Sequence, residues 1–165
     1  MSAEAERRHL TVLFCDVVGS TELSARLDPE DLRDIIRVYH ERVSDALTRF
    51  GGFVAKFMGD GVLAYFGYPQ AHEDDAERAV RAGLAIADPP LPEPLQVRIG
   101  IATGLAVVGD AIGSGMAQEQ AVVGETPNLA ARLQTLAEPN AVIVADSTRQ
   151  QLGALFELQI SGRRR

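Results

Sequence analysis

Apolar and polar residues follow two patterns along the chain, and these predict both strands and helices. Residues 10–15, with the sequence LTVLFC, form a short apolar run rich in β-forming residues and predict a buried strand. A short helix is predicted over residues 22–27, and Pro29 suits the first turn of a second helix. Apolar residues recur at three- and four-residue spacing from Leu32 to Phe50, which predicts a long amphipathic helix with one core-facing stripe.

The remainder of the chain continues this mixture. Strands are predicted over residues 53–57 and 62–66, joined by Met58-Gly59-Asp60-Gly61, whose glycines suit a tight hairpin loop. The other predicted elements are a helix over 72–87, strands over 95–103 and 105–108, a helix over 128–136, a strand over 141–145 and a helix over 147–152. This order predicts an α+β sandwich, with a mostly antiparallel sheet covered by helices on one face. Phe53, Phe57 and Phe66 are expected in its core.

Composition narrows the functional class. The length of 165 residues predicts one domain over residues 1–165, and no stretch approaches the roughly 18 consecutive apolar residues of a membrane helix. Lys and Arg number 16 and Asp and Glu number 23, which gives a net charge of −7. Such a chain is a poor candidate for binding nucleic acid or a membrane surface, since both depend on basic residues. An anionic ligand would need a few placed cations or a metal.

The two ends of the chain and its one cysteine bear on location. The N-terminus carries no secretory signal, and a single cysteine, Cys15, fits a reducing compartment, so we expect a cytoplasmic protein. Cys15 lies in the predicted buried strand and is expected to be an inert core residue. The abrupt end at Gly162-Arg163-Arg164-Arg165 favours truncation from a longer polypeptide.

Two aspartates beside glycines are the first candidates for chemistry. Asp16 directly follows the strand predicted over residues 10–15, and Asp60 lies between two glycines in the hairpin loop. Each alone is more commonly a turn residue than a metal ligand. Together, two carboxylates at strand ends could hold a pair of hard cations such as Mg²⁺, which could activate a hydroxyl and stabilise a leaving phosphate.

A glycine-containing turn follows Asp16 and leads into the first predicted helix. It consists of Val17, Val18, Gly19, Ser20 and Thr21. Backbone N–H groups in such a turn can bind a phosphate at the helix N-terminus. The same residues would also serve as a plain strand-to-helix turn, so the turn alone does not identify an anion site.

Four other polar residues have both a structural and a functional interpretation. Lys56 alternates with apolar residues in its strand and could simply face solvent. Arg98 lies within an apolar strand, where an unpaired charge is costly and must reach an edge or an anion. Asn128 and Arg132 are four residues apart and share one helix face. They could be a capping residue and a solvated charge, or they could present a hydrogen-bonding group and a cation to one ligand.

Four longer motifs contain these residues. They are FCDVVGST (14–21), KFMGDGVLAYF (56–66), VRIGIATG (97–104) and VVGETPNLAARL (122–133). In order and spacing they resemble the class III adenylate/guanylate cyclase catalytic domain, and the resemblance covers about residues 7–158. It implies a ferredoxin-like, palm-type βαββαβ sandwich. The sequence is similar to the bacterial variant in which the cyclase domain lies at the N-terminus of a larger protein with C-terminal regulatory domains.

The resemblance implies metal-binding and catalytic roles. Asp16 and Asp60 resemble the two metal-binding aspartates, the backbone carbonyl of Val17 would assist, and the implied cofactors are two Mg²⁺ or Mn²⁺ ions per site. Asn128 resembles the residue that orients the ribose, and Arg132 resembles the one that stabilises charge on the α-phosphate. The implied reaction is attack of the ribose 3′-OH of ATP on the α-phosphate, which gives 3′,5′-cyclic AMP and pyrophosphate.

The resemblance also implies how substrate is recognised and shared. Lys56 resembles a base-reading lysine, and a lysine favours ATP because adenine N1 accepts a hydrogen bond whereas guanine N1–H donates one. Arg98 resembles a residue near the polyphosphate. The sites of the family form in a head-to-tail dimer, so a homodimer is implied. One chain would supply the aspartates, and the other would supply Lys56, Asn128 and Arg132.

Three departures from the family pattern bear on these expectations. Ala121 stands where the family uses Asp or Thr as the second base-reading residue, and its methyl group makes no hydrogen bond, so purine selectivity could be relaxed. Ala102 replaces a histidine that is common in the third motif. A lysine often found beyond the last strands is absent. A guanylate cyclase and a non-catalytic nucleotide-binding or dimerisation module therefore stay open as alternatives.

Overall fold

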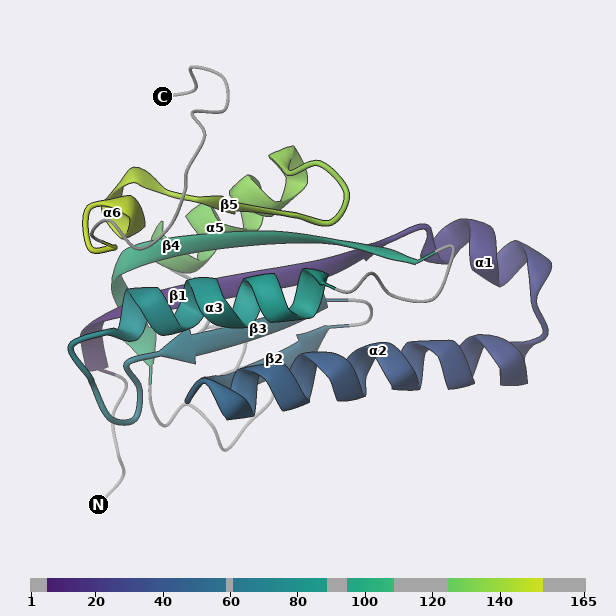
Figure 1. Ribbon diagram of the computed structural model, residues 1–165, viewed down its shortest axis with the longest axis horizontal. Helices are drawn as coiled ribbons and strands as arrows, with labels where there is room; N and C mark the ends of the chain where they lie inside the picture. Colours follow the sequence, from purple (N-terminus) through teal and green to yellow (C-terminus); the bar gives the residue numbers. More distant parts are fainter. Residues whose placement is uncertain (1–5, 59–60, 89–94, 109–124, 153–165) are drawn as a thin grey trace.

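The computed structural model describes residues 6–58, 61–88, 95–108 and 125–152 (Figure 1). The elements are β1 (Glu6–Val18), α1 (Ser20–Arg26), α2 (Pro29–Arg49), β2 (Phe53–Met58), β3 (Gly61–Phe66), α3 (Asp75–Ala87), β4 (Gln96–Val108), α5 (Glu125–Leu136), β5 (Ala141–Val144) and α6 (Asp146–Arg149). Each predicted helix has a counterpart among them. Within the described residues, no helix is long and apolar enough to span a membrane.

The described strands form one five-stranded sheet in the order β2-β3-β1-β4-β5. Its pairs are antiparallel, except that β4 and β5 are parallel. β1 and β4 pair along their whole length, from Glu6 opposite Val108 to Val18 opposite Gln96. The prediction of two strands on either side of Gly104 is wrong, because Gly104 pairs with Leu10 inside one continuous ladder. The predicted α+β class with a mostly antiparallel sheet is confirmed.

Helices cover both faces of this sheet. Leu13 and Cys15 belong to a buried cluster that includes residues of α2 and α3, whereas Leu10 and Val12 belong to a second cluster that includes Ala130 of α5. We call these sides the α3 face and the α5 face; Figure 1 shows α3 in front of the strands and α5 behind them. The expectation that helices cover one face holds for α2 and α3 and is wrong for α5. The apolar run of β1 sends alternate side chains to opposite faces, so both need cover.

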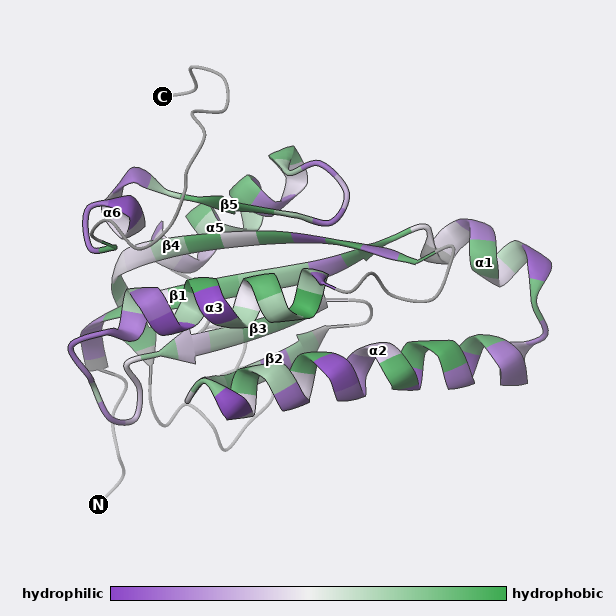
Figure 2. Ribbon diagram, viewed as in Figure 1, coloured by the Kyte–Doolittle hydropathy of each residue, from purple (hydrophilic) through white to green (hydrophobic). Residues whose placement is uncertain are grey.

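The long helix α2 has the predicted amphipathic pattern. Tyr39, Val43 and Leu47 are buried against the α3 face. Figure 2 shows apolar and polar residues alternating along α2, while β1 and β4 are largely apolar. The helix begins at Pro29 as predicted, although Asp28 makes no side-chain capping hydrogen bond. Most of its stability therefore comes from packing its apolar stripe rather than from its cap.

The edge strand β2 exposes two residues that were expected in the core. Phe53 is 39% exposed and Phe57 is 47% exposed, whereas Phe66 of β3 is fully buried as expected. In the described sheet β2 pairs with β3 alone, so its side chains have neighbours on one side only. The Phe57 ring lies 5.0 Å from the ring of His40 on α2, which covers part of it.

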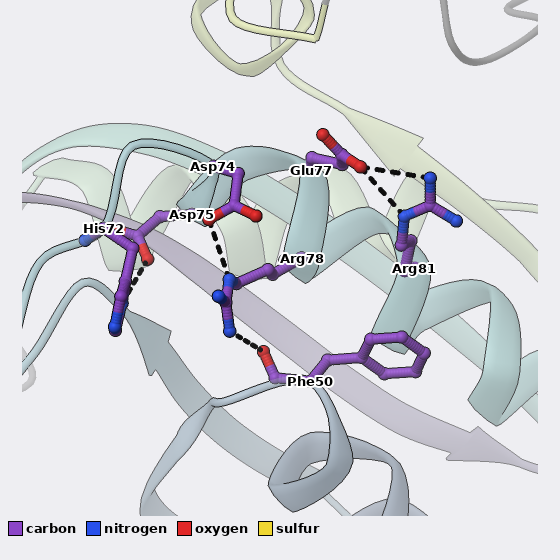
Figure 3. A network of polar contacts seen from close by, with 7 residues as sticks. All are labelled: Phe50, His72, Asp74, Asp75, Glu77, Arg78 and Arg81. Carbon is purple, nitrogen blue, oxygen red and sulfur yellow. Dashed lines mark hydrogen bonds and ion pairs between the residues drawn. The ribbon is translucent and has the colours of Figure 1, made fainter.

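Polar contacts fix the start of α3 against the end of α2 (Figure 3). Arg78 donates from Nε to Asp74 at 2.8 Å and from Nη1 to the carbonyl of Phe50 at 3.5 Å. The hydrogen bond from Arg78 lowers the pKa of Asp74 below its usual value. The backbone N–H of His72 donates to the Asp75 carboxylate at 2.9 Å. This bond holds the preceding turn, so the helix begins at Asp75 rather than at the predicted His72.

Candidate active site

Asp16 lies close to the end of β1, as predicted, and is half-buried. Its side chain is on the α5 face, because it follows Val12 and Phe14 at two-residue spacing along the strand. Its Oδ1 accepts a hydrogen bond from the backbone N–H of Val17 at 2.8 Å. This bond restricts the carboxylate to one orientation, which is what a ligand or metal site requires of its anchoring groups.

Arg98 is the direct cross-strand neighbour of Asp16. The two residues are opposite each other in the β1–β4 register, and both side chains point to the α5 face. Arg98 is half-buried, and its Nε is buried with no hydrogen-bond partner. A buried donor without a partner is unfavourable and would gain from an anion. The structure therefore places a cation beside the candidate metal-binding carboxylate.

The turn after Asp16 contains Gly19 in the left-handed region, with φ of 97°. Gly19 is the N-cap of α1, and its carbonyl accepts the backbone N–H of Leu23 at 3.1 Å. Thr21 is exposed, and no side-chain capping hydrogen bond is formed at the N-cap. The strand-to-helix turn is confirmed, while phosphate binding by residues 18–21 stays a prediction.

Lys56 reaches the α5 face through an irregularity in β2. The register between β2 and β3 shifts between Val54 and Lys56, so that Lys56 pairs with Leu63. Leu63 belongs to the α5-face cluster, whereas Val54 packs on the α3 face. The extra residue at this β-bulge thus turns Lys56 to the same side of the sheet as Asp16. Simple alternation from Val54 would have placed it on the other side.

Asn128 and Arg132 lie on α5, as predicted, and both are exposed. The opposite side of the helix is buried and carries Thr126, Ala130 and Gln134. Residues four apart lie about one helical turn from each other, so Asn128 and Arg132 form one polar surface that points away from the sheet. The predicted shared face is confirmed. Within one chain, this surface and Asp16 lie on different sides of α5.

The seating of α5 on β4 is the feature that the sequence analysis missed. Thr126 is buried, and its hydroxyl donates to the carbonyl of Leu105 on β4. Gly100 faces α5 so closely that an added Cβ would lie 2.6 Å from the backbone nitrogen of Gln134. The available signal was the small residues at every second position of β4, namely Gly100, Ala102 and Gly104. They leave room for a helix on that face, and Ala102 is fully buried there.

The donors that the structure describes suit a hard cation. They are the Asp16 carboxylate and the backbone carbonyl of Val17, and oxygen donors of this kind are those that Mg²⁺ and Mn²⁺ take. In the part of the chain that the structure describes, no three His, Cys, Asp or Glu side chains come together as a metal cluster. Asp60 and Ala121 lie outside the described residues, so their predicted roles stay predictions.

Cys15 and two surface hollows are not part of the candidate site. Cys15 is fully buried, burial raises the pKa of its thiol to about 12, and its Sγ lies 3.6 Å from the Tyr39 hydroxyl. This agrees with an inert core cysteine. Two surface hollows border α2, and one of them, lined by Ile36 and His40 among others, has a volume of about 460 Å³. Neither contains a predicted site residue.

Comparisons with known proteins assign the chain to a family. A family model described as "Adenylate and Guanylate cyclase catalytic domain" matches residues 3–164. An uncharacterized protein of Rhizobium meliloti (strain 1021) is 34% identical over 164 residues, which are 95% of this chain and 16% of that protein. An uncharacterized protein of Mycobacterium tuberculosis (strain H37Rv) is 38% identical over 136 residues, which are 81% of this chain and 25% of that protein. The chain thus spans about a quarter or less of the length of these relatives.

Solved structures agree with the fold. The adenylyl cyclase CyaB from P. aeruginosa superposes with a TM-score of 0.81 at 30% identity, covering 92% of this chain and 84% of that chain. The guanylyl cyclase Cya2 superposes with a TM-score of 0.80 at 30% identity, covering 100% of this chain and 90% of that chain. Both purine specificities occur among such neighbours, so the likeness does not choose between them. The chain belongs to the family of adenylate and guanylate cyclase catalytic domains.

Proposed function

We propose that the chain is the catalytic domain of an adenylate cyclase, which converts ATP to 3′,5′-cyclic AMP and pyrophosphate. The observation that carries the proposal is the placement of the motif residues. Asp16 and Arg98 are neighbours on the α5 face, and Asn128 and Arg132 form one exposed surface of α5. The ribose 3′-oxygen would bond to the α-phosphorus as the bond to the leaving pyrophosphate breaks.

Asp16, with the Val17 carbonyl and the predicted ligand Asp60, would hold two Mg²⁺ or Mn²⁺ ions. Bound there, the ions would favour ionisation of the 3′-OH and offset charge on the polyphosphate. The buried Nε of Arg98 has no hydrogen-bond partner, which supports a role for Arg98 in binding a phosphate oxygen. The glycine turn over residues 18–21 would add backbone donors to this anion site.

The choice of ATP rests on Lys56. Its ammonium group can donate a hydrogen bond to adenine N1, whereas guanine carries an N1–H donor at that position. The β-bulge that brings Lys56 to the α5 face, where it is half-buried, supports this role. A guanylate cyclase is the second candidate, since solved relatives include guanylyl cyclases and Ala121 supplies no side-chain hydrogen bond.

The site would form between two copies of the chain. Asn128 and Arg132 point away from the sheet that carries Asp16, so these residues of one chain would complete a site with Asp16 of another. Asn128 would orient the ribose, and Arg132 would stabilise the charge that develops on the α-phosphate. C-terminal regulatory domains in a longer protein are part of this proposal. So is a location in the cytoplasm, a reducing compartment that contains ATP and suits the buried thiol of Cys15.

A turnover assay with product identification tests the proposal. The protein is incubated with ATP or GTP and with Mg²⁺ or Mn²⁺, and the products are identified by mass spectrometry. Cyclic AMP formed from ATP, with GTP used less well, is the expected result. A preference for GTP would assign a guanylate cyclase. Nucleotide binding without either cyclic product would assign a non-catalytic module.

A further inference from the structure

The helix α5 lies unusually close to β4, at a position where β4 has no side chain. A Cβ placed on Gly100 would overlap the carbonyl oxygen of Ala130 and lie 2.6 Å from the backbone nitrogen of Gln134. Both of these atoms belong to the helix backbone, so no flexible side chain can move aside. Since ordinary contacts begin near 3.4 Å, any larger residue at position 100 would push α5 outward by roughly 0.8 Å or more.

A second contact fixes α5 at its first turn. The hydroxyl of Thr126 donates to the carbonyl of Leu105, and a Cβ on Gly104 would lie 2.7 Å from the Thr126 oxygen. Gly100 and Gly104 are four residues apart on the same strand, so both lie under the helix on the α5 face. The helix is therefore held at two points along its buried side.

These contacts set the position of the polar surface on the other side of α5. Asn128 and Arg132 lie opposite the buried residues Thr126, Ala130 and Gln134, so an outward shift of the helix moves both polar side chains by the same amount. We propose that Gly100 and Thr126 are positioning residues. They act through Asn128 and Arg132 by fixing the distance of α5 from β4 and the rotation of the helix about its axis. The proposal rests on the proposed function, because it requires Asn128 and Arg132 to act at the reacting end of the substrate.

A mutant cycle separates positioning from a general structural role. A misplacement near 1 Å can lower turnover on the order of 10²-fold, so Gly100→Ala should lower kcat by about that factor. In a background that carries both Asn128→Ala and Arg132→Ala, the same change should lower kcat less than about threefold, because both groups that it misplaces are already absent. An equal fall in both backgrounds would overturn the proposal.

Gly83→Ala is the matched control. Gly83 is also a buried glycine that contacts β4, but it lies in α3 on the other face, and its added Cβ would meet Ile99 and Val142 at 3.5 Å, an ordinary contact distance. It should leave kcat unchanged. At position 126, Thr126→Ser keeps the hydroxyl and should retain activity, whereas Thr126→Val removes it and should lower kcat with little change in KM. Equal activity of these two variants would contradict the role of the hydroxyl.

A crystal structure of the Gly100→Ala chain gives a readout that does not depend on activity. The expected result is an outward shift of α5 of roughly 0.8 Å relative to β4, with α3 unmoved. An unshifted α5 would overturn the positioning role even in an active enzyme. If the parent chain turns over neither ATP nor GTP, the proposed function fails, and the proposed effect of Gly100 on catalysis fails with it. A shifted α5 in the Gly100→Ala structure would then still show that Gly100 sets the position of the helix on β4.

Discussion

Three buried threonine hydroxyls link β1, β4 and α6 in a continuous chain. The Oγ1 of Thr103 lies 2.9 Å from that of Thr11 and 2.8 Å from that of Thr148. All three residues are buried, with exposed fractions of 7%, 1% and 0% in that order. A hydroxyl has one donor hydrogen and can accept as well, so Thr103 can donate to one neighbour and accept from the other. It is therefore the residue whose loss breaks both bonds.

Thr103→Val keeps the shape of the side chain and removes both hydrogen bonds. The change leaves the buried hydroxyls of Thr11 and Thr148 without these bonds, and each unpaired hydroxyl costs about 1–3 kcal/mol, so the variant should lose about 2–6 kcal/mol of unfolding free energy. Thr103→Ser is the matched control, because it keeps the hydroxyl and loses one methyl group worth about 1 kcal/mol.

Urea unfolding of the chain, followed by circular dichroism, measures both values. A domain of this size shifts by roughly 2–4 °C in Tm per kcal/mol, so Thr103→Val should also unfold at least 4 °C lower. Replacing all three threonines with valine should cost less than the sum of the three single changes, since no hydroxyl is then left unpaired. The reasoning fails if Thr103→Val is no less stable than Thr103→Ser, or if the three costs simply add.

Two further predictions concern catalysis and the buried thiol. Arg132→Ala should lower kcat on the order of 10²-fold, the scale of losing one preorganised transition-state donor. Arg149→Ala is the control, because it removes an exposed arginine that is paired with Asp146 on α6. Near-normal turnover of Arg132→Ala would refute the role assigned to Arg132. Burial raises the pKa of Cys15 from 9.0 to about 12, so the native chain should resist a thiol reagent at pH 8 and react when unfolded in urea. Because the unfolded thiol ionises near pH 9 and the folded one near 12, the native stability should fall as pH rises through that interval. The fall should be shallower in Cys15→Ala, and rapid labelling of the native chain would contradict the burial of the thiol.

Much of the fold follows from the hydrophobic pattern, and its errors have identifiable causes. The run over residues 10–15 and the stripe of α2 were predictable because burial requires their apolar positions. The cover on the α5 face was missed, although an apolar run on consecutive residues already implies two buried faces. Gly104 was interpreted as an interruption, whereas it lies inside β4 and makes room for Thr126. Phe53 and Phe57 were misplaced because the sequence does not show which strand is the edge.

Part of the candidate site was likewise predictable from the sequence, and part was not. The shared exposed face of Asn128 and Arg132 follows from helical spacing alone. The pairing of Asp16 with Arg98 depends on the register between strands about 80 residues apart, which no local pattern specifies. The face to which Lys56 points depends on one register shift in β2, and simple alternation would place it wrongly. The seating of α5 on Gly100 requires knowing which helix lies over β4.

Complementation between two inactive variants tests the central claim most directly, that one site for ATP is built from Asp16 of one chain and Asn128 of another. Asp16→Ala and Asn128→Ala chains are mixed in equal amounts, dimers are confirmed by light scattering, and cyclic AMP formation from ATP is measured. Half of the dimers should contain one chain of each kind and one intact site, so the mixture should recover about a quarter of the parent rate. A mixture no more active than its separate components, with mixed dimers present, would contradict the account.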